Sequence, residues 1–111
     1  MIGEIHKIRV SYFDTRSQST KHKFRPGLVI GEHDCDKDYV VLPISTIKKQ
    51  RYVDFSYDIE ILKVKYPLLN LQEDSYVRTG KQTQIPIQNV GGKISDLKSL
   101  YPDLFIDIIC L

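Results

Sequence analysis

The apolar residues of this chain occur in short runs with the spacing of β-strands, and helical spacing begins only near the C-terminus. Residues 8–12 alternate between apolar and polar side chains, which is typical of a half-buried strand. Residues 28–30 form an apolar run that suits a buried strand, and residues 39–44 follow after a charged turn. These two runs predict a hairpin. The pattern favours a small β-structure.

Polar breaks divide the rest of the chain. Residues 15–23 contain no apolar side chain and are expected to form a long basic loop. Strands are expected over residues 53–64, with an interruption near Tyr57, and over residues 75–87, with a break at Gly80. Gly91 and Gly92 are expected to lie in a loop.

The C-terminal segment changes to helical character. Residues 94–97 predict a helix start with Ser95 as its cap, and Pro102 suits the first turn of a second helix. The apolar residues after it recur with helical spacing, namely Leu104, Phe105, Ile108 and Ile109. We therefore expect a fold that is mainly β with a C-terminal helix, a small β-barrel with the helix packed on it.

Length and composition limit the remaining possibilities. The 111 residues suffice for one core, so we expect a single domain over residues 1–111. The apolar runs are too short to span a membrane, and Met1 begins a segment with no secretion signal. Two cysteines are too few for a disulfide framework, so we expect reduced thiols in a cytoplasmic protein.

Charge is unevenly distributed along the chain. The first 26 residues carry six Lys and Arg side chains against two acidic ones, whereas residues 27–76 carry six against nine. A basic N-terminal part is suited to a polyanion, although solvated surface charge alone explains it as well.

The densest basic segment, residues 21–26, surrounds one aromatic ring with cationic side chains; it comprises Lys21, His22, Lys23, Phe24, Arg25 and Pro26. Arginine donates two parallel hydrogen bonds to phosphate oxygens, and an aromatic ring can stack on an unpaired base. The segment therefore indicates a site for single-stranded RNA, although a short basic cluster is more often a solvated loop.

Two further features follow strand ends. Ser45 and Thr46 come directly after the strand of residues 39–44, where hydroxyls also serve simply as caps or turns. Arg78 and Lys81 flank the break at Gly80, where they are also compatible with an ordinary surface turn.

Metal ligands are not arranged convincingly anywhere in the sequence. Five potential ligands crowd one short turn, namely His33, Asp34, Cys35, Asp36 and Asp38. Such close spacing is better explained by a polar hairpin, and the downstream Glu of a calcium loop is missing. We expect neither a metal nor a cofactor.

Taken in order, four segments resemble the MazF/PemK family of bacterial toxin–antitoxin toxins: residues 25–30 (RPGLVI), 43–46 (PIST), 77–81 (VRTGK) and 93–97 (KISDL). The resemblance implies an SH3-like barrel that acts as a homodimer. It implies a metal-independent endoribonuclease that cuts single-stranded mRNA at short sequences. The implied protein partner is a cognate antitoxin that blocks the RNA groove.

The resemblance also implies roles for residues of this chain. Arg25 falls on the catalytic arginine of the family and Ser45 on its catalytic hydroxyl, which is usually Thr; Thr46 lies one position away. RNA-binding roles fall on Lys21, His22, Lys23, Phe24, Arg78 and Lys81. The expected products are a 2′,3′-cyclic phosphate and a 5′-hydroxyl.

Two points stay open from the sequence. Arg25 is a poor general base, and His22 is the only nearby group with a suitable pKa, although a loop histidine is more often merely solvated. Two other functions fit the same scaffold: a non-catalytic toxin that binds a protein such as DNA gyrase, and a plain RNA-binding barrel.

Overall fold

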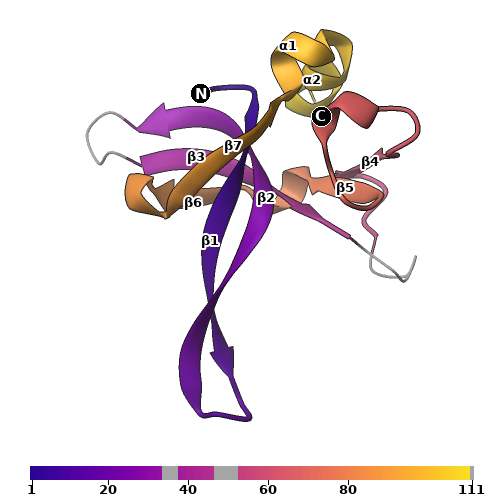
Figure 1. Cartoon of the computed structure of the whole chain (residues 1–111). Coiled ribbons are helices and arrows are strands. Elements are labelled where there is room, and N and C mark those ends of the chain that lie inside the picture. Colours follow the sequence, from indigo (N-terminus) through magenta and orange to yellow (C-terminus); the bar gives the residue numbers. More distant parts are fainter. Residues whose placement is uncertain (34–37, 47–52, 111) are drawn as a thin grey trace.

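The computed structural model describes residues 1–33, 38–46 and 53–110, which form a mainly β structure with C-terminal helices, as expected (Figure 1). The strands are β1 Glu4–Asp14, β2 Ser19–His33, β3 Asp38–Ser45, β4 Asp58–Ile61, β5 Ser75–Arg78, β6 Thr83–Pro86 and β7 Val90–Asp96. The helices are the 3-10 turns η2 Pro67–Leu69, η3 Thr79–Lys81 and η4 Ile87–Asn89, and the α-helices α1 Leu97–Leu100 and α2 Pro102–Ile109.

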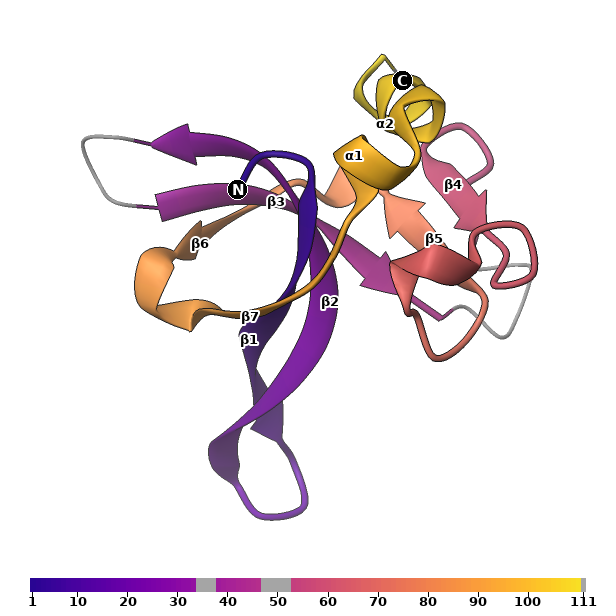
Figure 2. The ribbon, with the colours of Figure 1, turned by 45° about the horizontal axis from the view of Figure 1, so that its top comes forward.

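One antiparallel sheet contains all seven strands, in the order β4-β5-β3-β2-β1-β7 with β6 paired to β3. The predicted hairpin of β2 and β3 is confirmed, since Leu28 pairs with Leu42. The first half of β3, residues 38–41, pairs with β6, whereas Ile44 and Ser45 pair with β5. Because β3 changes partner along its length, the sheet curls into a half-barrel (Figures 1 and 2).

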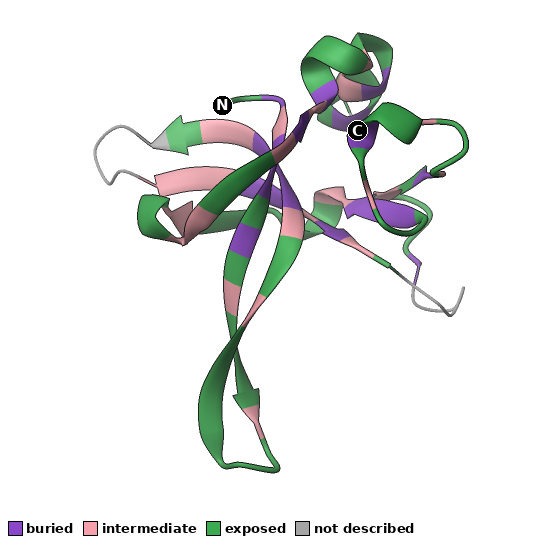
Figure 3. Ribbon diagram, viewed as in Figure 1, coloured by how far each residue is buried: buried purple, intermediate pink, exposed green. Residues whose placement is uncertain are grey.

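The main core joins the sheet to the C-terminal helices. Its buried residues are Ile5, Leu28, Leu42, Ile44, Ile61, Leu69, Val77, Leu97, Leu104 and Ile108. Truncating a leucine in such a core to alanine costs about 2–5 kcal/mol. Figure 3 shows that the buried positions gather where β1, β2 and β3 cross beneath the helices.

A second, smaller cluster of buried residues contains Ile8, Val29 and Val41. Val29 and Val41 are direct sequence neighbours of core residues Leu28 and Leu42, and successive side chains of a strand point to opposite faces. The second cluster therefore lies on the opposite face of the sheet from the main core.

A buried histidine ties the edge strand β7 to β1. The Nδ1 atom of His6 lies 2.9 Å from the carbonyl oxygen of Gly91, and its Nε2 atom lies 2.8 Å from Oε1 of Glu4. The hydrogen bond with His6 lowers the pKa of Glu4. Because a carbonyl oxygen only accepts hydrogen bonds, Nδ1 must be the donor to Gly91.

The prediction of a basic loop over residues 15–23 is wrong. β1 and β2 continue as a paired ribbon as far as Asp14 and Ser19, so the turn spans only residues 15–18. We call residues 9–24 the arm. β1 pairs with β7 only as far as Ile8, and β2 pairs with β3 only from Gly27 onward, so in the described part of the chain the arm strands pair only with each other. The arm projects from the body of the protein (Figure 1).

Smaller differences from the expectations concern element ends. The strand expected over residues 53–64 is limited to β4, and Gly91 and Gly92 lie in β7 rather than in a loop. The cap of α1 is Asp96, not Ser95: the Asp96 side chain accepts from the backbone N–H of Ser99 at 3.1 Å. Pro102 begins α2 as expected.

The helical stripe is confirmed in part. Leu104 and Ile108 are buried and Phe105 packs against the core, whereas Ile109 is exposed. No helix in residues 1–33, 38–46 and 53–110 is long and apolar enough to cross a membrane.

Candidate functional site

The end of the β2–β3 ladder brings Arg25 near Ser45. The last pair of this ladder joins Gly27 to Pro43, Arg25 and Ser45 each lie two residues beyond it, and both line the same two cavities. Beyond this point β3 pairs with β5 on its other side, so the strands open towards solvent. Arg25 is exposed and Ser45 is half-buried, so both can reach a ligand at the open end of the ladder.

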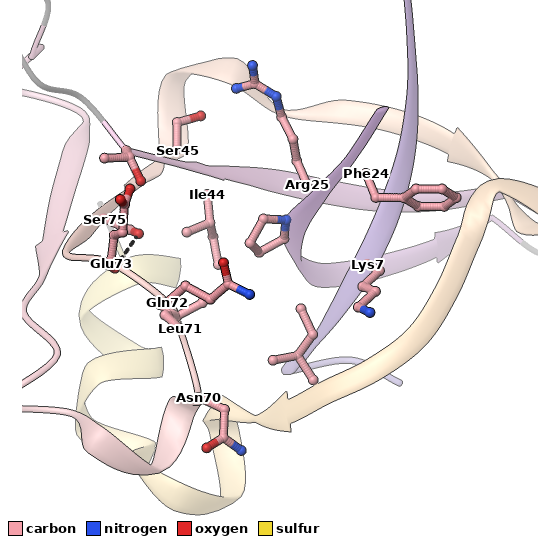
Figure 4. A pocket seen from close by; sticks show the side chains of 13 residues that line it. Lys7, Phe24, Arg25, Ile44, Ser45, Asn70, Leu71, Gln72, Glu73 and Ser75 are labelled. Atoms are coloured by element: carbon pink, nitrogen blue, oxygen red, sulfur yellow. Dashed lines mark hydrogen bonds between the residues drawn. The ribbon is translucent and has the colours of Figure 1, made fainter. Parts of the chain in front are cut away.

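The two cavities distinguish Ser45 from Thr46. Ser45 and Arg25 each lie two residues from the Gly27–Pro43 pair, share its face of the sheet and line both cavities. Thr46 follows the end of β3, is exposed and lines only the large cavity. In Figure 4 the Arg25 guanidinium and the Ser45 hydroxyl extend towards the same side, away from Asn70 and Leu71. Ser45 is thus the hydroxyl that accompanies Arg25.

A cavity of about 720 Å³, the large cavity, lies beside this pair. Its lining residues are Lys7, Phe24, Arg25, Pro26, Ile44, Ser45, Thr46, Asn70, Leu71, Gln72, Glu73, Ser75 and Ile94. In Figure 4, Glu73 and Ser75 lie on the Ser45 side of this cavity, and Phe24 and Lys7 lie across from them.

A second cavity of about 350 Å³, the apolar cavity, lies on the face of the sheet that carries the small cluster. It is lined by Ile8, Val10, Tyr12, Lys23, Arg25, Pro26, Gly27, Val41, Pro43, Ser45, Thr83 and Ile85. Three of these residues also line the large cavity: Arg25, Pro26 and Ser45. The candidate pair thus stands where the two cavities meet.

Three other residues of the 21–26 segment have different surroundings: Lys21, Lys23 and Phe24. Lys21 forms an ion pair with Asp14 at 2.9 Å, and this contact lowers the pKa of the Asp14 carboxyl. The Lys23 ammonium lies 4.8 Å from the centre of the Tyr12 ring and beside the apolar cavity. Phe24 is 64% exposed and lines only the large cavity.

His22 lies away from the Arg25–Ser45 pair. Its Nδ1 atom is 3.0 Å from the Ser11 hydroxyl on the neighbouring strand of the arm, and it lines neither cavity. An odd offset of three residues from Arg25 puts the two side chains on opposite faces of β2, about 10 Å apart along the strand. His22 is therefore badly placed to act on a group held by Arg25.

Arg78 and Lys81 lie on the far side of β3 from the arm. The Arg78 Nε atom donates to Oδ1 of Asp58 at 3.2 Å, so its charge is matched within the protein, and it lines neither cavity. Lys81 is exposed at the end of η3. Of the two, only Lys81 offers an exposed cation to a ligand.

Several lining residues of the large cavity were not expected from the sequence. Asn70, Gln72 and Glu73 come from the segment between η2 and β5, and Lys7 comes from β1. The polar run after the leucines at 68–71 is the only sequence signal for them, and it resembles any surface turn. Their position beside Arg25 depends on the pairing of β5 with β3.

Within the described ranges, no three His, Cys, Asp or Glu side chains gather into a metal site. The potential ligands Asp34, Cys35 and Asp36 lie outside the described residues. The same applies to the polar segment at 47–52.

Comparison with known proteins does not assign a family. No protein-family model matches the chain, and no curated protein sequence matches it significantly.

Proposed function

We propose that this protein is a metal-independent endoribonuclease of the MazF/PemK type, which cleaves single-stranded RNA. The observation that carries the proposal is the juxtaposition of Arg25 and Ser45, on one face of two adjacent strands and at the meeting point of two cavities. The two residues come from two of the segments on which the resemblance rests, and they lie 20 residues apart in the sequence.

RNA supplies its own nucleophile, so the site needs few chemical groups. The 2′-oxygen attacks the adjacent phosphorus, the new O–P bond forms, and the bond to the 5′-oxygen breaks, leaving a 2′,3′-cyclic phosphate and a 5′-hydroxyl. Arg25 stabilises the charge that grows on the phosphorane oxygens, and its guanidinium matches two of them. Ser45 holds a non-bridging oxygen or the 2′-hydroxyl in line. Water takes the 2′-proton and returns one to the 5′-oxygen.

The arm and Lys81 provide the electrostatic part of the proposal. Arg9, Arg16, Lys21 and Lys23 on the arm face only one acidic residue there, Asp14. A basic ribbon beside the site attracts a polyanion over its length, and Phe24 offers a ring for stacking at the rim of the large cavity.

The open half-barrel leaves an apolar face that is available for an assembly. We propose that the curled sheet is an SH3-like barrel, that two copies associate through the face of the apolar cavity while Arg25 and Ser45 stay open on the side of the large cavity, and that a cognate antitoxin covers the RNA groove. The support is the apolar cluster of Ile8, Val29 and Val41 together with the half-buried side chains around it, Val10, Tyr39, Ile85 and Val90. A symmetric pair would align two Arg25–Ser45 sites along one groove.

The test is incubation of the purified protein with a long synthetic single-stranded RNA in EDTA, with chemical identification of the new ends. The expected result is cleavage that yields cyclic phosphate and 5′-hydroxyl ends. Arg25→Ala should lower the rate by about 10²–10³-fold, as removal of one charge-stabilising donor does. Lys65→Ala is the control, because it likewise removes an exposed cation but lies outside the arm and lines neither cavity. RNA that stays intact with excess protein would contradict the proposal and favour a binding protein.

A further inference from the structure

Two aromatic side chains are held out in solvent on one turn. Phe55 is 77% exposed and Tyr57 is 51% exposed. Large exposed apolar groups that cluster on a surface mark sites of interaction more often than scattered ones do. Neither residue belongs to the motifs that suggested the function.

The turn that carries these rings is rigidly built. The backbone N–H groups of Tyr57 and Asp58 donate to the Asp54 carbonyl at 3.0 and 2.6 Å. The N–H of Ser56 donates to Oδ1 of Asp54 at 3.0 Å, and the N–H of Asp54 donates to Oδ2 of Asp58 at 2.9 Å. These bonds order the backbone of the turn, from which both exposed rings project.

Tyr57 is also anchored to η3. The backbone N–H of Thr79 donates to the Tyr57 carbonyl at 3.1 Å. The Gly80 backbone lies so close to the ring that an added Cβ would meet Cβ of Tyr57 at 3.3 Å and Cγ at 3.4 Å. The absence of a side chain at Gly80 therefore lets the ring lie flush against η3.

A short stretch of chain separates the residue that contacts Tyr57, Gly80, from the lining of the apolar cavity. The Thr83 hydroxyl donates to the Lys81 carbonyl at 2.9 Å, and Thr83 lines the apolar cavity together with Arg25 and Ser45. The three residues from Gly80 to Thr83 span at most about 11 Å. That reach is about three base steps of a nucleic-acid strand, at roughly 3.4 Å each.

Exposed charges of both signs lie near the turn, with Asp54 on the turn itself and Lys81 next to Gly80. Lys81 is exposed beside Gly80. The Asp58 carboxylate is nearly fully covered and matched by Arg78, and the Asp54 carboxylate accepts from the turn itself. Stacking needs only a π-face and a nearby cation for the phosphate, and this turn offers both.

We propose that Phe55 and Tyr57 form a stacking platform for unpaired bases that flank the scissile step of single-stranded RNA. The inference rests on the proposed function, because the strand that stacks here is the one that Arg25 and Ser45 act on. The platform extends the binding site beyond the cavities and makes affinity depend on RNA length.

The test uses the absence of tryptophan in the chain. Phe55→Trp and Tyr57→Trp each create a single fluorophore on the turn, and Ile106→Trp on α2, at a residue that is 56% exposed, is the control. The probe is a dye-labelled single-stranded 2′-O-methyl oligonucleotide, which binds but lacks the nucleophile. We expect tryptophan emission to be quenched in both turn variants and unchanged in the control, as dye anisotropy rises in all three.

A kinetic experiment distinguishes this stacking platform from a turn with a purely structural role. The double variant Phe55→Ala, Tyr57→Ala should raise KM for a long RNA by about tenfold or more for each stack that is removed, and leave kcat nearly unchanged. Two results would overturn the platform: tryptophan emission that does not change while dye anisotropy rises, or a KM that does not change in the double variant. Either result would favour a protein contact for the turn and would leave the ribonuclease proposal standing. If anisotropy does not rise at all, the proposed function itself fails.

Discussion

At the scale of single residues, the two cavities distinguish two adjacent hydroxyls. Ser45 and Thr46 are chemically similar neighbours, and the sequence alone leaves the choice between them open. The β2–β3 register places Ser45 on the face of Arg25, and both line the two cavities, whereas Thr46 follows the end of β3 and lines only the large cavity. A one-residue shift in register would reverse this assignment.

Gly27 sets the close approach of the strands next to the site. A Cβ at this position would lie 2.5 Å from Cγ1 of Val41 and 2.7 Å from Cγ1 of Ile8. We expect Gly27→Ala to lower the free energy of unfolding by about 1–3 kcal/mol, because the added methyl overpacks the small cluster. Urea denaturation at constant pH measures the effect.

The control for this prediction is Gly92→Ala, because a Cβ at Gly92 meets no atom within 4 Å. The urea concentration at the unfolding midpoint of Gly92→Ala should stay close to that of the unmodified protein. Equal midpoints for Gly27→Ala and Gly92→Ala would show that the crowding at Gly27 relaxes without cost, contrary to the packing described.

At the scale of elements, the sequence predicted most strands that carry an apolar face, but it missed β7, whose Ile94 packs against the core. The alternation at 8–12 and the apolar run at 28–30 identified parts of β1 and β2, and the break at Gly80 marked η3. The arm was missed because its β2 half, up to Lys23, carries only polar side chains. Its pairing comes from cross-strand hydrogen bonds and interactions such as that of Lys23 with Tyr12, which periodicity does not reveal.

Replacing residues 11–22 with an Asn-Gly turn tests the arm as an element. The replaced residues are exposed apart from the half-buried Asp14, so we expect the melting temperature to change little. RNA binding should weaken, and the slope of log affinity against log salt should fall by about 0.7 for each phosphate that the arm neutralises. Anisotropy titrations at several salt concentrations measure both. An unchanged salt slope would remove the arm from the RNA-binding surface.

The Asp96 cap of α1 makes the stability of the protein depend on pH in the acid range. Burial raises the pKa of Asp96, but the hydrogen bonds from the Ser99 N–H and hydroxyl outweigh it, so the pKa is lowered overall. A lowered folded-state pKa means that the charged cap stabilises the protein above the unfolded-state pKa, and that this contribution disappears as the pH falls through the folded-state pKa. Asp96→Ala should cost about 1 kcal/mol at neutral pH.

The matched comparison is thermal unfolding of the unmodified protein and Asp96→Ala at neutral pH and at acid pH. The difference in melting temperature should shrink towards acid pH, where the native carboxyl is protonated. A difference that stays constant with pH would mean that the carboxylate charge contributes nothing to the cap.

At the scale of the whole molecule, one face of the curled sheet is covered far better than the other. The main core is closed by α1, α2 and η2, whereas the small cluster around Val29 has only half-buried side chains over it. This asymmetry underlies the proposal that two copies pair through the face of the apolar cavity.

Val10→Asp tests that pairing. Val10 is half-buried and lines the apolar cavity, so a carboxylate there would be costly to bury in a dimer interface and is tolerated in a solvated monomer. We expect sedimentation to show a dimer for the unmodified protein and a monomer for Val10→Asp, with similar circular dichroism. If the unmodified protein is monomeric at concentrations where it is active, the proposed assembly is wrong.

The candidate site was predictable only where it lies at strand ends. Arg25 and Ser45 follow from two strands and their motifs, which can be read locally. Glu73 and Gln72 reach the large cavity only because β5 pairs with the end of β3, a long-range pairing that no local pattern signals. The exposed rings of the 54–57 turn were likewise invisible, because aromatic residues are expected in cores by default.

The most direct test of the central claim is a double-mutant cycle on RNA cleavage with Arg25→Ala, Ser45→Ala and the combined variant. If both groups act on one phosphate, the combined variant should be little slower than Arg25→Ala alone, because residues that act as a unit are not additive. Thr46→Ala, the control at the hydroxyl that lines only the large cavity, should stay within a few-fold of the unmodified rate. Fully additive losses, or a larger loss for Thr46→Ala than for Ser45→Ala, would contradict the shared site.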